Sequence, residues 1–322
     1  MVIGMIDIKT SKMFRGIAIL MVMISHYAWF VFNNPIHERL VLFITSWGVY
    51  GVDIFLVLSG YGLTKSAESK GIDGLFVLKR FVSVYLPYFF IVGFFNIVDK
   101  AFTCKEDVIR FIIAKDYWYL AVMFALYIMF MIFGKMGKYR DILLSVGVVA
   151  FSVFLWKRGM QDFWVLSNGA FLLGVYAASL EKKYGDKVEA FVKKSRFPII
   201  TIVMTLVFGF IFSKTGRMWA EVTRSLWFSL AALSLCICIK GRGVILPILG
   251  RFSLYIYLLH MWLFEKIAIF FKDWNSIASV FVTGVIILVI SIALGFAMET
   301  NLNLWVKAVQ NKKLQRKQMQ NR

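Results

Sequence analysis

The chain has 322 residues, of which 60% are hydrophobic, and only four are prolines. Its long apolar runs carry more apolar surface than a soluble core of this size can bury, which excludes a soluble globular enzyme. A formal charge of +19 would indicate a nucleic-acid-binding protein in a soluble domain, but basic cytoplasmic loops and attraction to anionic lipid account for most of it in a membrane protein.

Apolar runs long enough to cross ~30 Å of hydrocarbon predict an all-α integral membrane protein, a bundle of about ten transmembrane helices. In chain order these runs cover residues 13–32, 40–64, 81–98, 117–133, 142–156, 163–180, 197–212, 218–239, 253–271 and 277–298. Most of the basic residues between the runs fall on one side if the N-terminus is inside. The positive-inside rule therefore predicts that both termini are cytoplasmic.

The runs divide the chain into a single transmembrane domain, residues 1–300, and a basic cytoplasmic tail, residues 301–322. The tail begins with Leu302, Leu304, Trp305 and Val306, and we expect it to lie on the inner membrane surface as an amphipathic anchor. The first run lacks a cleavage pattern and is interpreted as a retained span. The three cysteines match neither a metal site nor a disulfide framework, and no metal is expected.

Three ionisable side chains interrupt the apolar runs at similar depth. With a helix rise of about 1.5 Å per residue, His26 lies about 16 Å, Asp53 about 18 Å and His260 about 14 Å above the inner boundaries of their spans. A charge at the bilayer centre costs roughly 2.5–3.5 kcal/mol, so such a group faces a cavity or a partner. We predict that Asp53 orients an imidazole, His26 being the first choice, and that the pair acts as a general base. The alternative is a structural pair between helices.

Basic residues mark the predicted inner mouth. Arg15 precedes His26 by eleven residues, which places both side chains on one stripe of a helix. Lys79 and Arg80 stand at the start of the third run. Guanidinium groups match phosphate by paired hydrogen bonds, so these residues are candidates for binding phosphate groups. Ordinary positive-inside charge explains them equally well.

Other polar residues are candidates to line a substrate cavity. Ser253, Tyr257 and His260 follow one another at i, i+4 and i+7, on one helix face. They line the cavity or form a hydrogen-bonded seam, and the spacing does not separate these interpretations. Arg224, with Glu221 nearby, lies toward the outer half of its span and either contacts a polar substrate or forms an internal ion pair.

Four stretches, in this order, resemble the acyltransferase-3 family of integral membrane acyltransferases, typified by bacterial polysaccharide O-acetyltransferases. They are FRGIAILMVMISHY (14–27), WGVYGVDIFLVLSGYGL (47–63), VLKRFVSVYLPYF (77–89) and GRFSLYIYLLH (250–260). The resemblance implies essential roles for Arg15 and His26, and Arg80 corresponds to a basic residue of the third motif. The family commonly has a second arginine one turn later, where this chain has Ser83 and Val84.

The resemblance implies transfer of an acyl group, usually acetyl from cytosolic acetyl-CoA, to a hydroxyl of a cell-envelope glycan or lipid-linked sugar. His26 would take the hydroxyl proton while Arg15, Lys79 and Arg80 hold CoA phosphates; an acyl-histidine relay is a second route. The expected partners are membrane lipid, the sugar acceptor, and a polymer-assembly protein or a separate extracytoplasmic transferase, but no nucleic acid. The expected location is a bacterial plasma or inner membrane.

Two other functions fit the same residues. Buried charge in a helix bundle also suits a transporter or flippase of an acylated or lipid-linked molecule, although the chain shows no two-half repeat. A non-catalytic subunit of an envelope-polymer complex is the third possibility.

Overall fold

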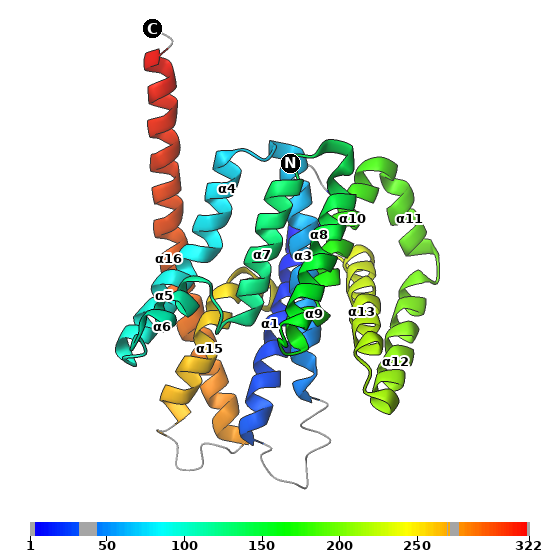
Figure 1. The fold of residues 1–322 in the computed structure, drawn as a ribbon, viewed down its shortest axis with the longest axis horizontal. Helices are drawn as coiled ribbons and strands as arrows, with labels where there is room; N and C mark the ends of the chain where they lie inside the picture. Colours follow the sequence, from blue (N-terminus) through cyan, green and yellow to red (C-terminus); the bar gives the residue numbers. More distant parts are fainter. Residues whose placement is uncertain (1–3, 32–43, 269, 271–276, 321–322) are drawn as a thin grey trace.

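The computed structural model describes residues 4–31, 44–268, 270 and 277–320, and these residues form helices and no strand. Most helices run side by side along one direction, and the last one projects beyond the bundle (Figure 1). The helices are α1 (Ile8–Val31), α3 (Trp47–Lys70), α4 (Gly74–Arg80), the π-helical η2 (Phe81–Tyr85), α5 (Leu86–Val98), α6 (Lys105–Ile112), α7 (Trp118–Phe133), the 3₁₀ η3 (Gly137–Tyr139), α8 (Arg140–Lys157), α9 (Phe163–Leu166), α10 (Asn168–Tyr184), α11 (Asp186–Lys194), α12 (Phe197–Thr215), α13 (Met218–Cys238), α14 (Ile245–Arg251), α15 (Ser253–Ala268) and α16 (Ile277–Gln320).

The described residues contain six helices that are long and apolar enough to cross a membrane, or seven if the bent pair α14–α15 forms one span. The predicted count of about ten is not confirmed. Helix α7 is apolar but has only 16 residues, and α1 and α3, which carry the charged side chains of the predicted site, are not among the six. The start of α1 and the far end of α16 lie at the same end of the molecule (Figure 1). Their cytoplasmic location stays a prediction.

Helix α16 has 44 residues and continues through the predicted domain boundary at residue 300. Figure 1 shows its C-terminal part extending away from the bundle as one continuous helix. The side chains of Leu302, Trp305 and Val306 lie outside the described part of the structure. The predicted amphipathic contact of the tail with the membrane surface therefore stays a prediction.

Glycines bring the central helices into backbone contact. A Cβ atom added at Gly60 of α3 would lie 2.1 Å from the carbonyl oxygen of Phe171 on α10. At Gly250 of α14 it would lie 1.7 Å from the carbonyl oxygen of Lys12 on α1, and at Gly16 it would likewise meet the backbone of α14. Small residues are the usual means of close helix packing in membranes. Helix α3 is thus held against α10, and α1 against α14.

Two irregular segments aim side chains into the bundle. The π-helical residues Phe81–Tyr85 separate α4 from α5, and π segments of this kind are frequent at functional sites. Asp73 caps α4 by accepting a hydrogen bond from the Phe76 amide at 2.8 Å. Between α14 and α15 the chain bends by 80°, so the start of α15 points back into the bundle.

We expect Gly60→Ala to destabilise the protein by about 1–3 kcal/mol, because the new methyl group meets backbone that cannot rotate away. Gly74→Ala is the matched control, since nothing lies within 4 Å of a Cβ atom at Gly74. There the change should be neutral or stabilising by about 0.4–1 kcal/mol through reduced entropy of the unfolded chain. Thermal unfolding in detergent measures both variants. Equal unfolding temperatures for the two would contradict the backbone contact.

Candidate active site

A cavity of about 1100 Å³ lies between α1, α3, the α4–η2 segment, α7 and the α14–α15 bend. Helix α3 lines it with one stripe of side chains, and α7 lines the other side with a second stripe. These stripes comprise Phe55, Ser59, Gly62, Ser66 and Lys70 on α3, and Tyr119, Met123 and Tyr127 on α7. Spacings of three and four residues put each set on one helix face, so two continuous helix faces form the walls.

Cationic side chains predominate in this cavity. Five cationic residues and two carboxylates line it, and one carboxylate, Glu299, is already paired with Arg251 at 2.8 Å. Within the described residues no carboxylate forms an ion pair with Arg15, Lys79 or Arg80. An excess of unpaired positive charge around a cavity attracts an anionic ligand.

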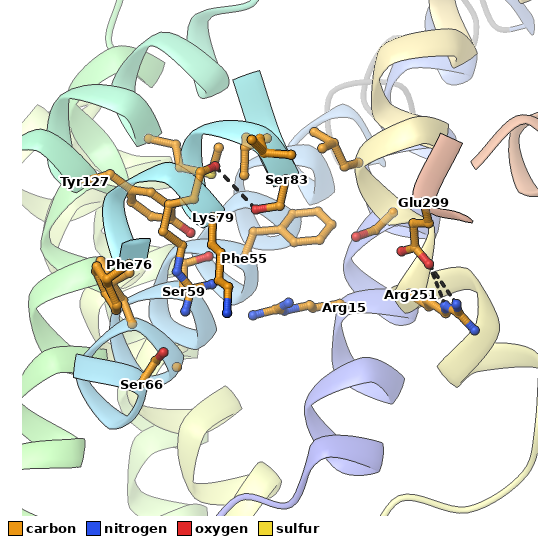
Figure 2. A pocket seen from close by; sticks show the side chains of 18 of the residues that line it. Arg15, Phe55, Ser59, Ser66, Phe76, Lys79, Ser83, Tyr127, Arg251 and Glu299 are labelled. Atoms are coloured by element: carbon orange, nitrogen blue, oxygen red, sulfur yellow. Dashed lines mark hydrogen bonds and ion pairs between the residues drawn. The ribbon is translucent and has the colours of Figure 1, made fainter. Parts of the chain in front are cut away.

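The three predicted phosphate-binding residues come together here. Figure 2 shows Arg15 and Lys79 reaching into the same space, and Arg80 lines the cavity with them. The guanidinium of Arg15 lies over Gly62, where a Cβ atom would be 4.0 Å from its Nη2 atom. Ser83, which stands where the second family arginine is expected, also lines the cavity and donates a hydrogen bond to the Arg80 carbonyl at 3.3 Å.

His26 forms its side-chain hydrogen bond with His260. The His26 Nδ1 and His260 Nε2 atoms are 2.7 Å apart, and the ring planes differ by 7°. The Nδ1 atom of His260 lies 2.7 Å from the backbone carbonyl oxygen of Tyr257. A carbonyl oxygen only accepts, so His260 carries its proton on Nδ1, and its Nε2 atom accepts from His26 Nδ1–H. In the neutral pair, the Nε2 atom of His26 is left with a free lone pair.

The predicted His26–Asp53 pair is not formed. Asp53 is fully buried, and its Oδ1 atom accepts a hydrogen bond from Ser225 of α13 at 2.7 Å. The reason is the direction of the side chain and not its depth. Gly51 packs against the α1 backbone at Ala18, and two residues turn an α-helix by about 200°. Asp53 therefore points away from α1, toward α13.

The other predicted cavity residues divide into two groups. Ser253 and Tyr257 line the cavity, which places the first turn of α15 at its wall. Arg224 does not line it: this side chain forms an ion pair with Glu221 and stacks over the Tyr50 ring at 4.7 Å. The internal ion pair is thus the arrangement that the structure shows for Arg224.

Tyr257 connects the cavity to the histidine pair. Its ring packs edge-on against the ring of Tyr119, with centroids 5.3 Å apart. Both tyrosines line the cavity, Tyr119 at the start of α7 and Tyr257 one turn into α15. His26 and His260 are not lining residues, but the Tyr257 carbonyl holds His260. His260 is buried, whereas His26 is half-buried. The cationic cavity and the histidine pair are therefore adjacent regions that meet at Tyr257.

Sequence reasoning missed part of this site. The polar stripe of Ser59, Gly62, Ser66 and Lys70 has helical spacing, which was a detectable signal for a cavity wall. Ser225 gave no such signal, because serines on an apolar helix are common and nothing in the local sequence assigns one to a carboxylate on another span.

We expect Ser225→Ala to destabilise the protein by about 1–3 kcal/mol, because it leaves the Oδ1 atom of Asp53 buried without a hydrogen bond. Ser229→Ala, one turn further along α13, is the control: Ser229 is fully buried and its Oγ atom has no partner in the described structure. Its removal should be neutral or slightly stabilising. If thermal unfolding of the two variants coincides, the Ser225–Asp53 contact contributes nothing to stability.

A search of the curated proteins and a search of the solved structures returned no match. A scan of family models matches residues 11–298 to Acyl_transf_3, described as an acyltransferase domain. The match includes both histidines of the pair and all five cationic residues that line the cavity. Glu299 is the first residue beyond it. The chain therefore belongs to the acyltransferase-3 family of membrane acyltransferases.

Proposed function

We propose that this protein transfers an acyl group, with acetyl as the first candidate, from a cytosolic acyl-CoA to a hydroxyl of a cell-envelope glycan or lipid-linked sugar. The observation that carries the proposal is a cavity lined by Arg15, Lys79 and Arg80, which form no ion pair with any described residue. Tyr257, which lines the same cavity, contacts the histidine pair. Family membership supports acyl transfer in general. The donor, the acceptor and the location in a bacterial plasma or inner membrane belong to the proposal.

The size and charge of the cavity suit a CoA thioester. Its volume of about 1100 Å³ slightly exceeds that of ordinary small-molecule sites, which measure about 300–1,000 Å³, as a ligand of the size of CoA requires. CoA carries a diphosphate and a further phosphate, and guanidinium and ammonium groups bind such groups by charge-assisted hydrogen bonds. With the phosphates at Arg15, Lys79 and Arg80, the extended pantetheine arm would run between the α3 and α7 faces toward Tyr257.

The histidine pair supplies a general base. The lone pair of His26 Nε2 would accept the proton of the attacking hydroxyl, and His260 would stabilise the resulting imidazolium by accepting from His26 Nδ1–H. The hydroxyl oxygen then forms a bond to the thioester carbon, the C–S bond breaks, and the imidazolium returns its proton to the CoA thiolate. In this mechanism His26 is the catalytic base and His260 is a positioning residue.

We expect His26→Ala to lower kcat for CoA release by about 10²–10⁴-fold, the usual contribution of a general base. His260→Ala should cause a smaller loss, because it removes only the group that orients His26. The assay is acetyl-CoA consumption by purified protein in nanodiscs, with a panel of cell-envelope glycans as acceptors. If acetyl-CoA neither binds nor turns over while the variants stay folded, transport of a lipid-linked molecule becomes the better hypothesis.

Asp53→Asn tests the position of the carboxylate in the same assay. The structure directs Asp53 to Ser225, so activity within a few-fold of the native protein is expected. If Asp53→Asn lost as much acetyl-CoA turnover as His260→Ala, the result would instead support the predicted role of Asp53 in orienting the catalytic histidine.

We expect Arg15→Gln and Arg80→Gln each to weaken CoA binding by roughly tenfold, or about 1.4 kcal/mol, because each removes one phosphate contact. Calorimetric titration with CoA measures the dissociation constants without any need for an acceptor. Arg110→Gln is the control, since Arg110 is exposed and paired with Asp116 outside the cavity. Binding that is unchanged in the two cavity variants would refute the assignment of the donor site.

A further inference from the structure

Two buried tyrosines of the cavity wall, Tyr255 and Tyr257, have no hydrogen-bond partner for the hydroxyl group among the described residues, and of these Tyr257 is the one that contacts His260. Tyr257 is 8% exposed and lines the cavity, yet its Oη atom has no hydrogen-bond partner in the described part of the chain. Its neighbour Tyr88 donates to the Phe111 carbonyl at 2.6 Å, and Tyr85 donates to the Ile112 carbonyl at 3.0 Å. A buried tyrosine hydroxyl usually finds a partner, so an unpaired one in a cavity wall is available to a ligand.

Packing fixes the Tyr257 ring without using its hydroxyl. The ring meets Tyr119 edge-on, with centroids 5.3 Å apart and planes at 78°, and meets Tyr117 at 6.1 Å and 73°. Its other neighbour is His260, at 5.8 Å between ring centroids. Edge-to-face contacts of this kind orient an aromatic ring. The hydroxyl is thus a positioned hydrogen-bond donor to which no described residue provides an acceptor.

The position of Tyr257 along the cavity separates it from the phosphate-binding end. It lies one helical turn beyond Ser253 on α15, about 6 Å further from the bend that carries Arg251. Its own carbonyl oxygen accepts the hydrogen bond from His260 Nδ1. Tyr257 therefore provides the polar lining atom beside the histidine pair, where the reacting end of a ligand held at Arg15 and Lys79 would arrive.

We propose that the Tyr257 hydroxyl donates a hydrogen bond to the thioester carbonyl oxygen and stabilises the oxyanion of the tetrahedral intermediate. The inference rests on the proposed function. As the acceptor oxygen bonds to the carbonyl carbon, the π electron pair moves onto the carbonyl oxygen, which the phenol O–H stabilises. The pair returns when the C–S bond breaks, and the CoA thiolate leaves with the proton held by His26. Tyr257 is regenerated unchanged.

The test is Tyr257→Phe, which removes one oxygen atom and keeps the ring packing. Removing a single oxyanion donor lowers kcat by about 10²–10³-fold, and we expect a loss on the order of 100-fold with KM for acetyl-CoA and the calorimetric dissociation constant of CoA within twofold of native. Tyr117→Phe is the matched control, since Tyr117 belongs to the same ring cluster but does not line the cavity. Its kcat should remain within threefold of native.

Three results would overturn the inference, and they are distinguishable. If the native protein turns over acetyl-CoA and Tyr257→Phe does so within threefold, the oxyanion role is refuted and the proposed function stands. If Tyr257→Phe and Tyr117→Phe lose activity and unfolding temperature together, Tyr257 acts only through packing. If the native protein turns over no acyl-CoA with any acceptor, the proposed function fails and the role of Tyr257 fails with it.

Discussion

The backbone contact between α1 and α14 is the constraint on which the rest of the site depends. Gly16 and Gly250 allow the two helices to touch without intervening side chains, and each glycine is directly adjacent to an arginine of the cavity, Arg15 or Arg251. Beyond the contact the chain bends by 80° into α15, which then runs beside α1 far enough for His260 to meet His26. One close contact thus sets both the cationic end of the cavity and the histidine pair.

Three cations of the cavity, Arg15, Lys79 and Arg80, form no ion pair within the described residues, although Arg251 in the same cavity is paired with Glu299. Some basic residues elsewhere in the bundle are paired, as in the contacts Lys65–Glu181 and Lys266–Asp99. Unpaired like charges around one space repel each other and disfavour the compact state. A bound anion would offset this repulsion, as the proposed binding of a CoA phosphate requires.

Much of the site could be predicted from the sequence, because helix periodicity and charge are local properties. The grouping of Arg15, Lys79 and Arg80 and the cavity positions of Ser253 and Tyr257 follow from spacing and from the inner boundary of each span. The hydrogen-bond partner of His26 could not be predicted in this way: Asp53 was expected, and the structure has His260. Helix rise gives the depth of His26, Asp53 and His260, but the facing direction of Asp53 depends on which face of α3 packs against α1. That contact is tertiary, and only the structure assigns it.

The π-helical segment Phe81–Tyr85 follows directly after Lys79 and Arg80. A π turn holds one more residue than an α turn, so it accommodates an extra residue within one continuous helical run without rotating α4 against α5. Loss of a single residue from this segment would therefore restore regular α-helix and leave Lys79 and Arg80 facing the cavity. The same loss within a regular α-helical stretch would rotate one half against the other by about 100°. In homologous chains, a one-residue length change is therefore expected to be tolerated at this point and not in the α-helical turns beside it.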